Sequence, residues 1–199
     1  VRCVRRPSVA IVTTGTELRA AGEPLAPGQI YESNGPMLAA LFRRAGAVVS
    51  LTRAVADDPD AHRVALRAAV AAADIVVTSG GVSVGPHDLV RPTLADLGVS
   101  EVFWGVSMRP GKPLLFACRE RTLVFGLPGN PVSSLVGALL FVVPAIRGLQ
   151  RLSPGPHFGR GVAAVDIPAR PERDDFPRAV IQAGEDGPAL VPLRGQESH

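Results

Sequence analysis

The sequence predicts an α/β fold, a three-layer α/β/α domain with a mostly parallel sheet followed by the start of a small β-rich domain. Between Ser8 and Ile146, short β-branched runs alternate with longer segments rich in Ala, Leu and Arg, which is typical of βαβ units. After Arg147, Gly, Ser and Pro recur at turn spacing. We therefore expect an α/β domain over 1–147, a linker over 148–160 and a truncated β-rich domain over 161–199.

The first half of the chain is expected to hold strands at 9–12, 47–51 and 75–77 and a helix at 36–45. Asp58 is expected to cap a further helix, because Pro59 suits the first helical position. An apolar face on this helix is expected from Ala61, Val64, Ala68 and Ala72. His62 is expected to be solvated.

The second half is expected to hold a short helix at 89–97, strands at 99–106, 114–117 and 122–125, and a last helix at 131–147. In the tail, strands are expected at 161–167, 178–183 and 189–193. The chain begins at Val1 without methionine and stops at His199, which indicates a fragment of a longer protein.

The composition excludes several classes of protein. With 199 residues, 46% of them hydrophobic and 20% charged, the chain can bury a core, so disorder and coiled coil are excluded. Its 21 Gly and 19 Pro leave no uninterrupted apolar run of about 20 residues, so no membrane span is expected. Cys3 and Cys118 indicate neither a disulfide framework nor structural zinc, which favours the cytoplasm. The basic residues are mostly dispersed, which argues against nucleic-acid binding.

Four polar loops follow expected strands or precede expected helices, at 13–17, 33–36, 78–88 and 126–134. In a doubly wound sheet such loops gather at the carboxyl edge, where ligands bind. The paired glycines of the third loop would let the backbone close on a phosphate, although they do not match the dinucleotide fingerprint. In the fourth loop Asn130 is the expected N-cap and Pro131 the first helical residue. Alternatively, the loops at 13–17 and 33–36 are ordinary turns and caps.

Three carboxylates, Glu17, Asp57 and Asp88, stand at these loops and favour Mg²⁺ over zinc. Taken singly, each is more often a helix cap or a solvated surface group than a metal ligand. The turn from Met108 to Pro113 adds the positive charge of Arg109 and Lys112, but it is not a P-loop because Pro113 replaces the Ser/Thr. His87 lacks a matching nucleophile and is expected to be a bystander.

Taken in order, these motifs resemble those of the molybdopterin molybdenumtransferase family, which comprises bacterial MoeA and the E domain of gephyrin. The motifs are Thr-Gly-Thr-Glu-Leu (14–18), Ile-Tyr-Glu-Ser-Asn (30–34), Asp-Asp-Pro (57–59), Ser-Gly-Gly-Val-Ser-Val-Gly-x-x-Asp (79–88), Arg-Pro-Gly-Lys-Pro (109–113) and Gly-Leu-Pro-Gly-Asn-Pro-Val-Ser (126–133). The tail segments 173–179 and 195–199 are similar to stretches of the family's C-terminal domain.

The resemblance implies that the chain accepts adenylylated molybdopterin, releases AMP and inserts molybdate in a Mg²⁺-dependent step. By motif position, Glu17, Asp57 and Asp88 become the catalytic and metal-binding carboxylates. The implied contacts to the pterin, the phosphates and the molybdate are Thr14, Asn34, Ser79, Gly80, Gly81, Ser83, Arg109, Lys112, Pro128, Asn130, Pro131 and Ser133. The implied partners are a second copy in a homodimer, the adenylyltransferase and apo-molybdoenzymes, with no nucleic acid and no membrane.

Two departures and two alternatives accompany this interpretation. Thr16 stands where the family usually has Asp, and Gly105 stands where members often have a basic residue. The family's amino-terminal domains, which lend residues to the pocket across a dimer interface, are not represented, so the isolated chain is expected to be poorly active. The alternatives are a molybdopterin adenylyltransferase, which shares the domain fold, and a non-enzymatic scaffold that binds a peptide.

Overall fold

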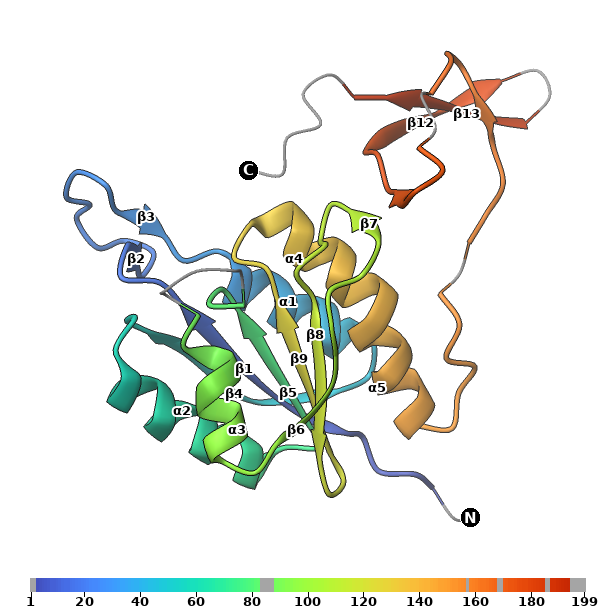
Figure 1. Cartoon of the computed structure of the whole chain (residues 1–199). Helices are drawn as coiled ribbons and strands as arrows, with labels where there is room; N and C mark the ends of the chain where they lie inside the picture. Colours follow the sequence, from blue (N-terminus) through green and yellow to red (C-terminus); the bar gives the residue numbers. More distant parts are fainter. Residues whose placement is uncertain (1–2, 83–87, 157, 168–169, 185–186, 194–199) are drawn as a thin grey trace.

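The computed structural model describes residues 3–82, 88–156, 158–167, 170–184 and 187–193, and these form a sheet between two layers of helices (Figure 1). The sheet has the strand order β4-β1-β5-β9-β8-β6, and only β8 runs against the others. Its strands are β1 (Ser8–Thr14), β4 (Val48–Val55), β5 (Ile75–Ser79), β6 (Ser100–Trp104), β8 (Leu115–Arg119) and β9 (Thr122–Leu127). The predicted α/β class with a mostly parallel sheet is confirmed.

Helices cover both faces of this sheet. They are α1 (Asn34–Arg44), α2 (Pro59–Ala72), α3 (Val90–Asp96), α4 (Pro131–Gly137), the π-helical turn η1 (Ala138–Val142) and α5 (Val143–Leu149). Along β1, Ala10 and Val12 pack into the cluster under α2 and α3, while Val9 and Ile11 pack into the cluster under α1, η1 and α5. Because both faces of the strand are buried, its sequence is continuously apolar rather than alternating.

Small sheets complete the described structure. They are β2 (Leu18–Arg19) with β3 (Ile30–Tyr31), β7 (Met108–Arg109) with β11 (Asp174–Asp175), and β10 (Val162–Ala163) with β13 (Gly187–Pro192) and β12 (Ala179–Gly184). The strand-rich tail was expected, but its first strand is much shorter than the predicted 161–167. β2, β3, β7 and β11 were not predicted, since two-residue strands carry no readable periodicity.

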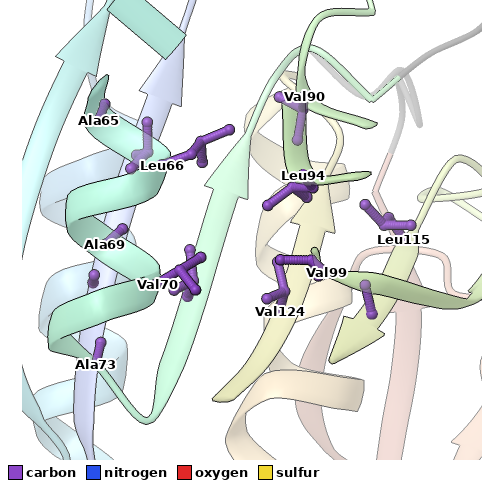
Figure 2. Close-up of a cluster of buried hydrophobic side chains, with 14 of the residues drawn as sticks. Ala65, Leu66, Ala69, Val70, Ala73, Val90, Leu94, Val99, Leu115 and Val124 are labelled. Atoms are coloured by element: carbon purple, nitrogen blue, oxygen red, sulfur yellow. The ribbon is translucent and has the colours of Figure 1, made fainter. Parts of the chain in front are cut away.

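Helix α2 begins as predicted but buries a different face. The Asp58 carboxylate accepts a hydrogen bond from the Ala61 N–H at 2.8 Å, and Pro59 is the first residue of the helix. The residues that face the sheet are Ala65, Leu66, Ala69 and Val70 (Figure 2). Of the predicted apolar face, Ala61 packs against the core cluster, but the rest is wrong, since Val64 is 59% exposed and Ala68 and Ala72 lie on the solvent side. In so alanine-rich a helix, the two large side chains at i and i+4, Leu66 and Val70, decide which face is buried.

Several other boundaries shift for local reasons. Helix α1 begins at Asn34, two residues before the predicted start at Pro36. Strand β6 ends at Trp104 rather than at Val106, because the next residue, Gly105, has φ +87 and leaves the extended conformation.

The sequence was expected to hold no segment that could span a membrane, but the helical segment from Pro131 to Leu149 passes a test for one. By length and composition alone, these 19 residues could cross one. However, Ala138, Val142 and Ile146 are fully buried against the sheet. The core helix of a soluble protein passes the same test, so the segment is weak evidence for a span.

Candidate anion-binding site at the carboxyl edge of the sheet

The four adjacent parallel strands β4, β1, β5 and β9 end side by side. The strand register pairs Thr14 with Val55, Thr13 with Ser79, and Ser79 with Leu127. The loops that follow β1, β4, β5 and β9 therefore leave the sheet along one edge, and those after β1, β5 and β9 were predicted to meet there. The chain runs from β1 outward to β4 and then returns to β5 on the other side of β1 (Figure 1). This makes the β1–β5 crevice a topological switch point, where ligands of open α/β sheets bind.

A cavity of about 100 Å³ lies at this point. Its walls come from the ends of β1 and β5, from the start of α1, from the β9–α4 loop and from β2–β3. The lining residues are Thr13, Thr14, Glu17, Leu18, Ile30, Tyr31, Glu32, Ser33, Asn34, Ser79, Gly129 and Pro131. Four implied binding residues, Thr14, Asn34, Ser79 and Pro131, are thus brought together with Glu17. Tyr31 and Glu32 were not singled out, although both stand in the 30–34 motif.

Several buried polar atoms at this edge have no hydrogen-bond partner among the described residues. They are Oγ1 of Thr13, Thr14 and Thr78, and Oδ1 of Asn34 and Asn130. Buried polar atoms in proteins are nearly always paired, and an unpaired one costs about 1–3 kcal/mol. Such a concentration of unpaired hydroxyl and amide oxygens at one edge is the signature of a site that receives a polar ligand or ordered water.

Asn34 joins three loops by a side-chain network. Its Nδ2 donates to Ser79 Oγ at 2.9 Å and to the Gly129 carbonyl at 2.7 Å. The Ser79 hydroxyl in turn lies 2.8 Å from Ser134 Oγ and 3.2 Å from the Pro128 carbonyl. The hydroxyl of Ser79 therefore connects the third loop to the start of α1 and to the β9–α4 loop by hydrogen bonds. Ser134, absent from the predicted site, is fully buried in this network; its position in the first turn of α4 was the available signal.

The third loop passes so close to the first that it requires glycine. Gly80 has φ +95, and a Cβ at this residue would lie 2.5 Å from the carbonyl oxygen of Thr14. Gly129 of the fourth loop also lies close to Gly80, since a Cβ at Gly129 would lie 3.4 Å from the Gly80 Cα. The absence of a side chain at Gly80 and Gly129 therefore lets the backbones of the first, third and fourth loops lie against one another.

Two of the three predicted carboxylates border the first loop. Asp57 Oδ2 accepts a hydrogen bond from the Thr16 N–H at 3.2 Å. The Glu17 carboxylate folds back over Gly15. The backbone carbonyl of Glu17 accepts from the Ile30 N–H at 3.0 Å, which ties the first loop to β3. Among the described residues, no three His, Cys, Asp or Glu side chains gather as a metal cluster. Mg²⁺ commonly takes one or two carboxylates plus substrate phosphates, so Glu17 and Asp57 suit that kind of site.

Asp88 lies apart, at the start of α3. Its Oδ1 accepts from the Arg91 N–H at 3.4 Å, and its side chain is only 12% exposed. Burial raises the pKa of the Asp88 carboxyl, against the opposing effect of the Arg91 N–H and charge. The predicted contact Ser83 and the bystander His87 lie outside the described residues.

Arg109 and Lys112 lie beside α4 rather than in the 100 Å³ cavity. Both are exposed, and the turn between them packs on α4, where a Cβ on Gly111 would lie 3.6 Å from the Ser133 carbonyl. Arg109 lines a larger cavity, of about 290 Å³, together with tail residues such as Phe176. Asn130 and Pro131 occupy the predicted N-cap and first helical positions of α4, although the Asn130 side chain makes no capping hydrogen bond.

His62 is buried beneath the third loop, so the expectation of a solvated histidine is wrong. It is 1% exposed, its Cε1 would lie 3.8 Å from a Cβ on Gly81, and neither ring nitrogen has a partner among the described residues. It lies one turn before Leu66 on the face that packs against the sheet. Burial lowers the pKa of His62, although the negative charges of Asp57 and Asp58 oppose that effect.

We expect this histidine to make the protein acid-sensitive. Because the pKa of His62 is lowered in the folded state, the folded protein protonates it at a lower pH than the unfolded chain, which protonates it below about pH 6.5. Stability is therefore complete above that pH and falls as the pH drops towards the lowered pKa of the folded state. Melting temperatures at pH 8 and pH 5 should differ less in His62→Leu than in the unsubstituted chain. An equal difference in both proteins would contradict the role given to His62.

Comparisons with known proteins identify the family of the chain. The family model described as a probable molybdopterin binding domain matches residues 10–148. A molybdopterin molybdenumtransferase from Nostoc is 47% identical over 158 residues, covering 78% of this chain and 36% of the relative. One from Haemophilus influenzae is 36% identical over 203 residues, covering 100% of this chain and 50% of the relative.

Solved structures give the same result. The crystal structure of a molybdopterin biosynthesis MoeA protein from Pyrococcus horikosii has a TM-score of 0.75 and 28% identity, covering 98% of this chain and 47% of that one. A structure of molybdenum cofactor biosynthesis protein B, at 15% identity and a TM-score of 0.55, shares the fold alone. The chain spans half or less of the length of these two curated relatives and of the Pyrococcus structure.

Proposed function

Because the chain belongs to the molybdopterin molybdenumtransferase (MoeA) family, we propose that its switch-point cavity binds adenylylated molybdopterin for the insertion of molybdate with release of AMP. The observation that carries the proposal is the group of unpartnered buried polar atoms at the carboxyl ends of β1 and β5 and the start of α1.

The unpartnered atoms are of two kinds, hydroxyls and amide oxygens, and each kind suits a different part of the ligand. The hydroxyls of Thr13 and Thr14 can donate to phosphate oxygens, which only accept. The amide oxygens of Asn34 and Asn130 can only accept, so they suit the N–H and O–H groups of a pterin or a ribose. We assign Gly80 and Gly81 the role of leaving room for the ligand beside Thr14. Pro128, Pro131 and Ser133 would shape the wall formed by the fourth loop.

Two carboxylates would hold Mg²⁺: that of Glu17, which lines the cavity, and that of Asp57, which contacts the first loop at Thr16. Glu17 and Asp57 border the first loop and supply the hard oxygen donors that this ion prefers. When bound, Mg²⁺ would stabilise the negative charge that develops on phosphoryl oxygens as the diphosphate linkage breaks. Asp88 would face the same ligand from the far end of the third loop. Arg109 and Lys112 would attract molybdate, since both are exposed cations beside the first turn of α4.

The two alternative functions carry less support. The relatives that are 36–47% identical are named molybdopterin molybdenumtransferases, which disfavours an adenylyltransferase. A scaffold that had lost its chemistry would not need the unpartnered polar atoms of the cavity. A homodimer, a cytoplasmic location and contacts with the adenylyltransferase and apo-molybdoenzymes remain predictions for the full-length protein.

Calorimetric titration with adenylylated molybdopterin, with and without Mg²⁺, tests the proposal. In Mg²⁺, Asp57→Asn should weaken binding about tenfold, because a charged hydrogen-bonding and metal-binding group is worth about 1.5–3 kcal/mol. The matched control is Asp60→Asn, an exposed acid in the first turn of α2, which should bind as the unsubstituted chain does.

With EDTA present, the difference between Asp57→Asn and the unsubstituted chain should disappear. If Asp57→Asn and the unsubstituted chain bound the ligand with equal affinity in Mg²⁺, Asp57 would not belong to the site. Synthesis of adenylylated molybdopterin from ATP and molybdopterin would instead support the adenylyltransferase.

A further inference from the structure

Trp104, at the end of β6, and Arg91, in the first turn of α3, form a cluster beside the third loop. The indole Nε1–H of Trp104 donates to the Val82 carbonyl at 3.1 Å. The Arg91 guanidinium carbon lies 5.1 Å from the centre of the Trp104 ring, which is cation–π geometry. Neither residue lines the 100 Å³ cavity, and neither belongs to the predicted site.

The same arginine also holds the other end of the loop. Arg91 Nη1 lies 4.0 Å from Asp88 Oδ2, and the Arg91 backbone N–H faces Asp88 Oδ1. Glu101, on β6, fixes the guanidinium in turn, with its Oε2 at 3.0 Å from Nη2 and 3.1 Å from Nε. Because both nitrogens point to one carboxylate, the plane of the guanidinium is set by the ion pair.

Val82 is held on its apolar side as well. Its side chain is 1% exposed, and its Cγ1 would lie only 2.7 Å from a Cβ on Gly126 of β9. The carbonyl of Val82 is thus fixed by Trp104 while its side chain is locked into the core. The two described residues that flank 83–87, Val82 and Asp88, are therefore both anchored to one cluster made by β6 and α3.

We propose that Trp104 and Arg91 are positioning residues, which set the distance between the glycine pair of the third loop and the carboxylate of Asp88 so that both face one ligand. The proposal rests on the proposed function only for the identity of that ligand. Neither residue touches the ligand; each acts through Val82 or Asp88.

Hydrogen–deuterium exchange of the unliganded chain tests the anchoring directly. Trp104→Phe keeps an aromatic ring beside Arg91 but removes the N–H donor to Val82, together with the part of the indole that packs against the core. Arg91→Lys keeps the charge but loses the planar fork that pairs with Glu101 and stacks on the ring. In both variants, exchange in a peptide over 79–90 should rise about fivefold to tenfold, as expected for the loss of about 1 kcal/mol. Exchange in β1 should not change.

The matched control is Thr122→Val, at the start of β9 and therefore at the end of the sheet away from the third loop. It also deletes one side-chain donor to a backbone carbonyl, since Thr122 Oγ1 donates to the Ala73 carbonyl at 3.2 Å. It should leave exchange over 79–90 unchanged at a similar cost in melting temperature. If Trp104→Phe raised exchange uniformly, or did not raise it over 79–90, the residue would be structural only and the proposal would be wrong.

Ligand binding supplies the second readout. Trp104 is the only tryptophan in the chain, so its fluorescence should change when adenylylated molybdopterin binds to the unsubstituted chain. Affinity should fall about tenfold in Arg91→Lys and stay constant in Thr122→Val.

The two proposals fail in different ways. Absence of binding by the unsubstituted chain would contradict the proposed function, and the exchange data would still decide the anchoring. Unchanged affinity in Arg91→Lys, with binding intact in the unsubstituted chain, would overturn the positioning role.

Discussion

Gly80→Ala is expected to destabilise the protein by about 3 kcal/mol or more and to abolish ligand binding. The new Cβ would lie 2.5 Å from the backbone carbonyl oxygen of Thr14, and no rotamer change can relieve a contact between a Cβ and a backbone atom. Overpacking costs about 1–3 kcal/mol, and the φ of +95 adds about 1 kcal/mol for any residue with a Cβ. Urea denaturation monitored by circular dichroism would measure the loss.

A matched control separates the clash from the backbone strain. Gly98, which follows α3, also has a positive φ, +73, but a Cβ there would meet nothing within 4 Å. Gly98→Ala should therefore cost only about 1 kcal/mol and leave ligand binding intact. If the two variants lost equal stability, Gly80 would be required for its backbone conformation alone, and the close approach of the first and third loops would not be an energetic constraint.

Asn34→Asp is expected to have the second large effect, on binding more than on stability. The carboxylate would lose both hydrogen bonds that Nδ2 donates, to Ser79 Oγ and to the Gly129 carbonyl. It would also place a negative charge inside a cavity proposed to hold phosphates. We expect a loss of about 3 kcal/mol in unfolding free energy at pH 7, because a buried charge would face an unpaired carbonyl oxygen.

Asn34→Ala is the matched comparison, since it removes the same hydrogen bonds without adding charge. It should cost about 1–2 kcal/mol. The gap in stability between the two variants should narrow towards pH 5, where a protonated Asp can again donate a hydrogen bond. Calorimetry should find the Asp variant at least tenfold weaker than the Ala variant in ligand affinity. Equal affinities would mean that no anion lies next to Asn34.

Local patterns in the sequence determined the α/β class and most of the elements. The apolar run at 9–12 predicted a strand, which the structure shows to be buried on both faces. Asp58-Pro59 predicted the start of α2, because capping chemistry depends on neighbours in the chain. Where local preference was weak, prediction failed. The alanine-rich α2 offered two similar faces, and only packing of Leu66 and Val70 against the sheet chose between them.

The sequence also placed most of the candidate site residues in loops that meet at one edge, because the carboxyl ends of parallel strands always do. The sequence could not determine which hydrogen bonds each of these side chains makes. The Ser79 hydroxyl is committed to Asn34 and Ser134, whereas Thr13 and Thr14 keep hydroxyls without partners in the described residues. These outcomes depend on atoms that are 45 or more positions apart in the chain, and spacing along the chain carries no information about such contacts.

His62 and Trp104 illustrate the same limit. Each looked unremarkable in the sequence, one as a polar residue on a helix and the other as part of a strand. Residue type and local period fixed their secondary structure. The tertiary structure alone decided that His62 is buried without a partner among the described residues and that Trp104 reaches the Val82 carbonyl, because burial and hydrogen bonding are set by the elements that pack around a residue.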